Sequence, residues 1–141
     1  MSMLANNVEQ DSLFGDVIYA YTRAQALADG YLVDVSKMAK EAGFKISTAL
    51  TRSVWEDCVA WNDDDNKRQT YQDEDGRLWD VLYMASMAAR NSLNSEQLKY
   101  QLYRVPRGGR GKRARLVTLK LHIGPGDHGE PVVTIMQPNE D

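Results

Sequence analysis

Apolar and polar residues in the first fifty positions form short runs framed by helix-capping residues. Thr22, with Gln25 three positions later, matches a capping box and predicts a short helix, and Gly30 stands where a helix C-terminus favours positive φ. Ser36 and Gly43 frame a second short helix in the same way. Between the two helices, the run "LVDVS" could form a strand or a turn.

Two further helices are predicted from apolar residues that recur every three or four positions, over residues 52–61 and 76–91. The apolar positions are Val54, Cys58 and Trp61 in the first and Leu78, Val81, Leu82, Ala85 and Ala89 in the second. Trp79, Tyr83 and Met87 widen the apolar stripe of the second helix, which predicts contacts on two sides of that helix.

Downstream of these helices the apolar period changes from 3.6 to 2, which is typical of strands. Residues 98–103 and 115–123 alternate between apolar and polar, and residues 132–136 are rich in β-branched side chains. An earlier run, residues 17–21, also favours a strand. We predict an α+β fold in which several helices pack on a C-terminal three-strand antiparallel meander.

The chain of 141 residues with 43% hydrophobic content predicts one domain with a single core. We expect a flexible N-terminus over residues 1–12, a single α+β domain over 13–138 and a tail over 139–141. No run approaches a membrane-spanning length, and no basic-then-apolar leader opens the sequence. The single cysteine allows no internal disulfide, so we expect a soluble protein of a reducing cytoplasm.

Positive charge is concentrated in one stretch of a chain whose formal net charge is −3. Residues 104–120 hold seven of the seventeen Lys and Arg residues and no acidic residue, so the remaining positions carry −10. The basic residues are Arg104, Arg107, Arg110, Lys112, Arg113, Arg115 and Lys120. Six carboxylates gather in a second stretch, at Asp63, Asp64, Asp65, Asp73, Glu74 and Asp75. We expect one basic and one acidic loop on the same small domain.

Two interpretations of these loops remain open, since charge runs serve both as solvated connectors and as contact surfaces. Gly108, Gly109 and Gly111 predict a mobile basic hairpin loop whose arginines adapt to an acidic partner. Such a loop could bind the phosphates of a nucleic acid, with Tyr100 or Tyr103 stacking on a base. The acidic loop would instead bind a basic partner, for example by imitating a phosphate backbone in a DNA-binding groove.

No motif for catalysis, metal binding or cofactor binding meets its spacing requirements. The basic loop has Arg113 where a phosphate-binding P-loop needs Ser or Thr. An EF-hand loop in the acidic stretch would place Lys67 at a ligand position. His122 and His128 lie far in sequence from Cys58, which we interpret as a buried inert thiol. We assign no catalytic residue, metal or cofactor, and we favour a non-enzymatic role while leaving enzymatic activity open.

Arg23 and Arg52 each follow a threonine at a predicted helix start, where a cation gains nothing from the helix dipole. We hypothesise that they line a shared pocket for an anionic group. A pocket of this kind would suit an enzyme or a binder that acts on a nucleotide-like anionic ligand.

Four blocks resemble a family of small uncharacterised proteins: "DSLFGDVIYAYTRAQALADGYLVDVS", "ALTRSVWEDCVAW", "DEDGRLWDVLYMASMAAR" and "VTLKLHIGPGDHGEPVVTIMQP". The resemblance covers residues 11–138 and implies an origin on bacterial plasmids, integrative conjugative elements or phages, and thus a bacterial cytoplasm. It supplies no reaction and no site residues.

The leading functional prediction is a non-enzymatic accessory protein that binds a host protein or ribonucleoprotein complex. An inhibitor of a defence system, of the anti-CRISPR or anti-restriction type, is its most concrete form. The first alternative is a nucleic-acid-binding factor that uses the basic hairpin over residues 104–120. We expect no membrane partner, and the sequence does not specify an oligomeric state.

Overall fold

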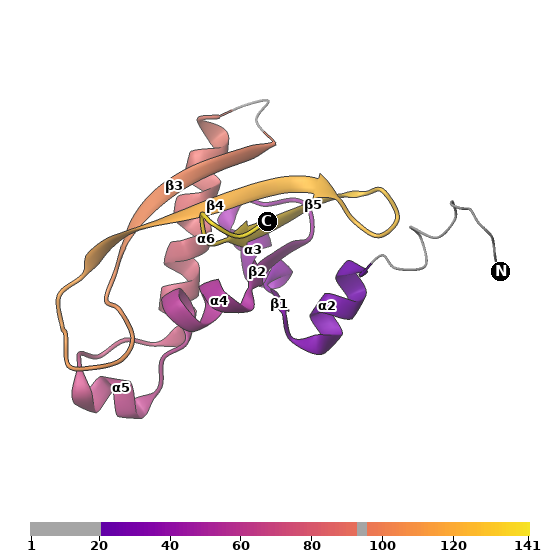
Figure 1. The fold of residues 1–141 in the computed structure, drawn as a ribbon. Helices are drawn as coiled ribbons and strands as arrows, with labels where there is room; N and C mark the ends of the chain where they lie inside the picture. Colours follow the sequence, from indigo (N-terminus) through magenta and orange to yellow (C-terminus); the bar gives the residue numbers. More distant parts are fainter. Residues whose placement is uncertain (1–20, 93–95) are drawn as a thin grey trace.

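The computed structural model describes residues 21–92 and 96–141 (Figure 1). Its helical segments are α2 (Arg23–Asp29), α3 (Ser36–Ala42), α4 (Arg52–Val54), the π-helical turn η1 (Trp55–Val59), α5 (Asp63–Arg68) and α6 (Glu74–Arg90). Its strands are β1 (Leu32–Asp34), β2 (Thr48–Thr51), β3 (Gln97–Arg104), β4 (Arg115–Pro125) and β5 (Pro131–Met136). The predicted flexible N-terminus and most of the apolar run 17–21 lie outside the described residues.

The five strands form one mixed sheet in the order β1-β2-β5-β4-β3. β2 runs parallel to β5, with Leu50 opposite Ile135, whereas the other neighbouring strands pair antiparallel. The chain is α+β, but the predicted three-strand antiparallel meander is wrong, because β1 and β2 extend the sheet beyond β5. These two strands have three and four residues, too few to show an alternating pattern in the sequence.

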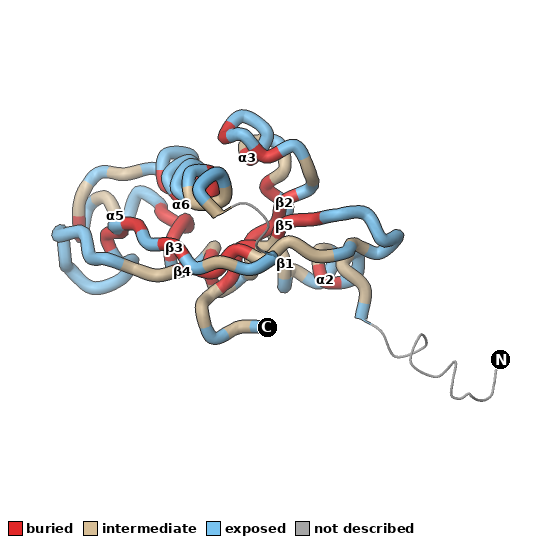
Figure 2. Tube along the Cα trace, turned by 90° about the horizontal axis from the view of Figure 1, so that it is seen from above, coloured by how far each residue is buried: buried red, intermediate tan, exposed pale blue. Residues whose placement is uncertain are grey.

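Helices lie on both faces of this sheet (Figure 2). α3 and α6 cover one face, and α2 and the C-terminal residues lie on the other. The main core fills the space between the sheet and the α3–α6 pair. Its fully buried side chains include Leu50, Val81, Leu82, Leu119, Leu121 and Ile135. Burying one side chain of this size contributes about 1.5–3 kcal/mol, so this layer holds the scaffold together.

Three of the four capping signals near the N-terminus form the predicted helix ends. Both hydrogen bonds of the capping box between Thr22 and Gln25 are present. Gly30 and Gly43 adopt φ angles of 82° and 116°, where a side chain would be strained. The N-cap of α3 is the residue before Ser36, so Ser36 is the first residue of that helix and not its cap.

The helix predicted over residues 52–61 is not one regular helix. Thr51 caps α4 by accepting a hydrogen bond from the N–H of Val54 at 3.3 Å. The chain then widens into η1, where the N–H of Ala60 donates to the carbonyl of Trp55, five residues back, at 2.8 Å. A single π turn shifts the register by one residue, which a search for three-and-four spacing does not detect.

The stretch predicted as an acidic loop contains α5 and the start of α6. The side chain of Asn62 caps α5, and Asp73 caps α6 by accepting from the N–H of Gly76 at 2.6 Å. Most of the clustered carboxylates therefore lie in first helical turns, where the helix dipole favours negative charge. Their placement has a local structural cause as well as any role in binding.

Candidate binding surface

Two of the seven predicted basic contact residues, Arg104 and Lys120, are buried. The guanidinium of Arg104 donates to the carbonyls of Cys58 (3.0 Å) and Arg77 (3.1 Å) and to the carboxylate of Asp80 (2.7 Å). Lys120 donates to a backbone carbonyl of the C-terminal segment. Both side chains therefore connect parts of the fold and are withdrawn from solvent.

Arg107, at the base of the basic loop, forms an ion pair with Asp65 at 2.9 Å. Asp65 has no exposed side-chain surface and also accepts from Arg68 at 2.7 Å and from the N–H of Asn62 at 2.9 Å. Burial acts to raise the pKa of Asp65, but the Asn62 hydrogen bond and the two guanidiniums outweigh it and hold the pKa below its ordinary value. One predicted acidic site residue thus pairs with one predicted basic site residue inside the molecule.

The buried side chain of Gln69 holds the basic loop against the end of α5. Its Nε2 donates to the carbonyls of Pro106 (2.8 Å) and Gly111 (2.6 Å), and its Oε1 accepts from the N–H of Gly108 (3.0 Å). Gly108 and Gly109 have φ angles of 100° and 70°, which allow the loop to turn between these contacts. The loop is therefore anchored to α5 and the residue that follows it by three hydrogen bonds and one ion pair, made by residues 106–111.

The other four basic residues are exposed, three near the tip of the β3–β4 hairpin and one at the start of β4. They are Arg110, Lys112, Arg113 and Arg115. In Figure 1 this loop lies beside α5 at one end of the sheet. Tyr103 and Leu116 face each other on β3 and β4, with 67% and 51% of their surface exposed. A cationic tip and an apolar pair thus occupy neighbouring parts of one hairpin.

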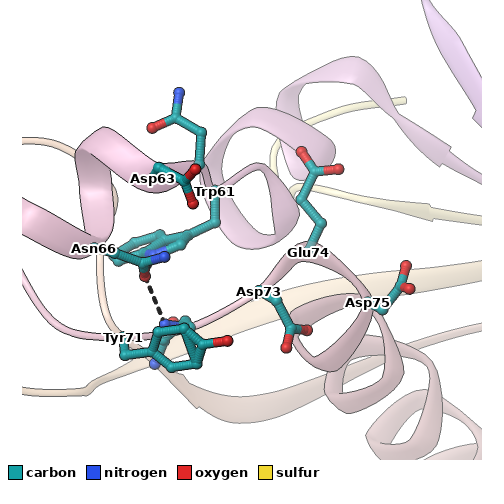
Figure 3. A pocket seen from close by; sticks show the side chains of 9 residues that line it. Trp61, Asp63, Asn66, Tyr71, Asp73, Glu74 and Asp75 are labelled. Atoms are coloured by element: carbon teal, nitrogen blue, oxygen red, sulfur yellow. Dashed lines mark hydrogen bonds between the residues drawn. The ribbon is translucent and has the colours of Figure 1, made fainter.

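Five of the six predicted acidic site residues are exposed: Asp63, Asp64, Asp73, Glu74 and Asp75. All except Asp64 line a pocket of about 360 Å³ together with Trp61 and Tyr71 (Figure 3). The carboxylates are spread around this pocket rather than converging on one point. Within the described part of the chain, no group of three His, Cys, Asp or Glu side chains is arranged to hold a metal ion. The pocket therefore presents diffuse negative charge.

Arg77 is a buried cation that sequence reasoning missed. It donates to the carbonyls of Val59 and Val105, each at 3.1 Å, and its guanidinium lies 4.5 Å from the ring centre of Trp61. Burial and the nearby Arg104 lower its pKa to about 10. No local signal identifies Arg77, because an arginine in the first turn of a helix ordinarily faces solvent. It joins η1 to the base of the basic loop.

Arg23 and Arg52 do not share a pocket. Arg23 donates to the side chain of Thr134 (2.7 Å) and the carbonyl of Val133 (2.9 Å), which fastens α2 to β5. The guanidinium of Arg52 lies 4.6 Å from the ring centre of Tyr31. The two arginines line different depressions, so the hypothesised joint anion pocket is not formed.

A groove of about 290 Å³, which sequence reasoning also missed, lies along β3. Its lining residues are Asp80, Tyr83 and Met84 of α6 with Gln101, Leu102, Tyr103 and Leu116 of the sheet. The second set of contacts predicted for α6 is not formed in the described structure, since Trp79, Tyr83 and Met87 are 37%, 44% and 37% exposed. The wide apolar stripe of this helix was the sequence signal for an apolar surface here.

Comparison with known proteins places the chain in a family without adding a reaction. None of the helices in the described ranges is long and apolar enough to cross a membrane. No curated protein and no solved structure matches the chain. A family model described as "Family of unknown function (DUF6573)" matches residues 11–141. This description names no source, so the mobile-element origin remains a prediction. Because this match covers nearly all of the sequence, the chain belongs to the Family of unknown function (DUF6573).

Proposed function

We propose that this protein is a non-enzymatic binding protein whose contact surface for a macromolecular partner is the exposed tip of the β3–β4 hairpin. This proposal rests on the observation that some cations of the basic segment serve the fold and others are free to contact a partner. Arg104 and Lys120 are buried and Arg107 is paired with Asp65, while four other cations are presented together to solvent. A solvated connector needs no internal anchor, but this loop is held in place by Gln69 and Asp65. Preorganisation of this kind lowers the entropic cost of binding.

The charges around the tip favour a protein partner over a long nucleic acid. α5, which carries the exposed Asp63 and Asp64, lies beside the loop (Figure 1). These carboxylates would repel a phosphate backbone that extends past the tip, whereas a protein surface can place a basic side chain opposite them. The exposed Tyr103 and Leu116 add apolar area of the kind found in the centre of protein interfaces.

The second candidate is a nucleic-acid-binding factor. It is favoured by the four exposed cations and by the ring of Tyr103, which is available for stacking on an unpaired base. In this case binding would fall steeply as the salt concentration rises, because cations displace counterions from the phosphates.

We further propose that the partner is a protein or ribonucleoprotein complex of a bacterial host. The implied mobile-element origin supports this setting, and inhibition of a CRISPR or restriction defence is the most concrete form of it. The geometry of the hairpin contributes nothing to this choice of pathway, which rests on the resemblance.

Affinity capture from bacterial lysate, with the full chain as bait and with nuclease added, tests the proposal. The triple substitution R110S/K112S/R113S removes three cations of the tip. Its matched control, K37S/K40S/K45S, removes three exposed lysines on and after α3. We expect a defined protein complex that survives nuclease, with at least tenfold lower recovery on the tip variant alone. Equal recovery on both variants would contradict the proposal, and loss of the partner with nuclease would favour the nucleic-acid alternative.

A further inference from the structure

β3 is an edge strand, and part of its backbone has no partner among the described residues. The N–H of Ile123 donates to the carbonyl of Glu96 at 2.7 Å, which sets the phase of the β3–β4 ladder. Hydrogen-bonded and non-bonded pairs alternate in an antiparallel ladder. The even-numbered residues of β3 therefore direct their backbone groups toward β4, and Lys99 and Gln101 direct theirs toward the open edge.

The groove along β3 lies beside these open backbone groups. Tyr83 and Met84 of α6 form one wall, and Tyr103 and Leu116 lie across the strand from them. An added strand would lie about 4.7–4.9 Å from β3 and would enter this groove. Its successive side chains would point to opposite sides, one toward α6 and the next toward the Tyr103–Leu116 pair.

We propose that the outer edge of β3 binds an extended acidic segment of a partner protein by strand addition, with an apolar side chain of that segment in the groove. This inference rests on the proposed function, since it names the docking mode of the same hairpin. The N–H and C=O groups of Lys99 and Gln101 bond to the segment and supply its alignment. The groove selects an apolar residue at one position.

The charges around the groove select an acidic segment. Asp80 is the only acidic lining residue, and Arg104 neutralises it at a distance of 2.7 Å. Lys99 is exposed on β3, Arg113 is exposed in the β3–β4 loop, and Arg115 is exposed at the start of β4. A segment that runs along β3 toward the tip therefore meets positive charge at Lys99 and again beside the loop.

A second copy of this chain does not offer the same complementarity. The side chains on the exposed face of β3 are Gln97, Lys99, Gln101 and Tyr103, none of which is acidic. Pairing of two β3 edges would bring another lysine where a carboxylate is needed. A lysine on an edge strand also opposes edge-to-edge pairing.

A display library of short random peptides, selected against the full chain, tests strand addition. Gln101→Pro removes the outward N–H and leaves the ladder with β4 intact, because proline is tolerated on the open side of an edge strand. Gln101→Thr is the matched control, since it loses the same side chain and its 3.4 Å bond to Thr118 but keeps the N–H. We expect selected peptides to combine an apolar residue with several Asp or Glu residues and to bind the proline variant at least tenfold more weakly than the control.

Amide hydrogen exchange on the unaltered protein gives a second measurement that does not depend on how the proline variant folds. The amides of Lys99 and Gln101 should exchange at least tenfold more slowly when a selected peptide is bound. Equal peptide affinity for both Gln101 variants, unchanged exchange at both amides, or selection of peptides without acidic residues would overturn the inference. If the free chain forms a dimer and Gln101→Pro converts it to a monomer, the outer edge of β3 binds a second copy of the chain instead.

The lysate experiment separates this inference from the proposed function. If the tip variant loses the captured partner and Gln101→Pro retains it, strand addition fails while the proposed function stands. If both variants retain the partner, both fail. If the tip variant and Gln101→Pro both lose the partner while Gln101→Thr retains it, both the proposed function and strand addition are supported.

Discussion

Asp65 joins the acidic and basic segments through a carboxylate that has no exposed surface and faces Arg68 and Arg107. Asp65→Asn keeps the shape but leaves two guanidiniums without their counter-charge. We expect a loss of about 2 kcal/mol in the free energy of unfolding, measured by urea denaturation. Asp64→Asn, at the exposed neighbouring position of the same helix, should change it by less than about 0.5 kcal/mol. Equal losses in the two variants would refute this role.

The same carboxylate predicts a sensitivity to acid. Its pKa in the folded protein lies below the ordinary value, so the folded state favours the ionised form. Its contribution to stability is complete above the ordinary aspartate pKa of about 3.9 and is lost as the pH falls through the lower folded value. The stability gap between the wild type and Asp65→Asn should therefore narrow in this acid range. Urea midpoints measured across the range check this, and a gap that stays constant would show that the charge is irrelevant.

Cys58 is buried on the core side of η1, and burial raises the pKa of its thiol to about 11. At pH 8 about one thiol in a thousand would be ionised, and the thiolate is the reactive form. We expect no reaction of the native protein with a disulfide reagent such as dithionitrobenzoate over the time in which the denatured protein reacts fully. Fast labelling of the native protein would show that the thiol is accessible and would reopen a reactive role.

At the scale of elements, the anchor between α5 and the β3–β4 loop determines how the cationic tip is presented. Gln69→Ala removes the three hydrogen bonds to Pro106, Gly108 and Gly111. We expect a stability loss of about 1–3 kcal/mol and at least tenfold faster hydrogen exchange at the Gly108 amide. Lys67→Ala, at an exposed position of the same helix, is the control. Unchanged exchange at Gly108 would mean that the loop holds its shape without Gln69.

Elements with local causes could be predicted from the sequence, and elements with long-range causes could not. The capping box at Thr22 and the alternation in β3 and β4 depend on neighbouring residues. The parallel pairing of β2 with β5 depends on contacts between segments more than eighty positions apart, such as Leu50 with Ile135. A run of four residues carries no information about such a partner, which is why the sheet was predicted with too few strands.

The candidate site shows the same limit of prediction from the sequence, because some charged residues are buried for local reasons and others for long-range reasons. The alternation of Leu98, Tyr100 and Leu102, continued by two positions, places Arg104 on the buried face, so its burial could have been inferred. The burial of Asp65 and Arg77 depends on how α5, η1 and the hairpin meet, and no local pattern reports that. The charge pattern along the chain therefore locates the two charged segments, but it does not separate internal ion pairs from exposed cations.

At the scale of the whole molecule, the C-terminal segment connects elements from three parts of the chain. Glu140 provides a carbonyl to Lys120 of β4 and a carboxylate to the hydroxyl of Thr51 at the end of β2 (2.8 Å). Gln137 donates to the carboxylate of Asp57 in η1 at 2.9 Å. Residues 139–141, predicted as a tail, thus include Glu140, which contacts β2 and β4, and the C-terminal chain lies on the face of the sheet opposite α3 and α6 (Figure 2).

Removal of residues 137–141 should therefore destabilise the entire fold rather than only its end. Lys120 is almost fully buried, and without the segment its ammonium loses a carbonyl acceptor. We expect a loss of about 2 kcal/mol in the free energy of unfolding, within a single cooperative transition. Removal of Asp141 alone is the control, because this residue is exposed.

A double-mutant cycle isolates the Lys120 contact within that loss. In a chain that carries Lys120→Met, the ammonium–carbonyl bond is already absent, so the same truncation should cost about 1 kcal/mol less than in the wild type. Thermal and urea unfolding of the four proteins give this coupling directly. If the truncation costs the same with lysine and with methionine, the segment stabilises the sheet by covering it and through its contacts to Thr51 and Asp57, and the buried ammonium plays no part.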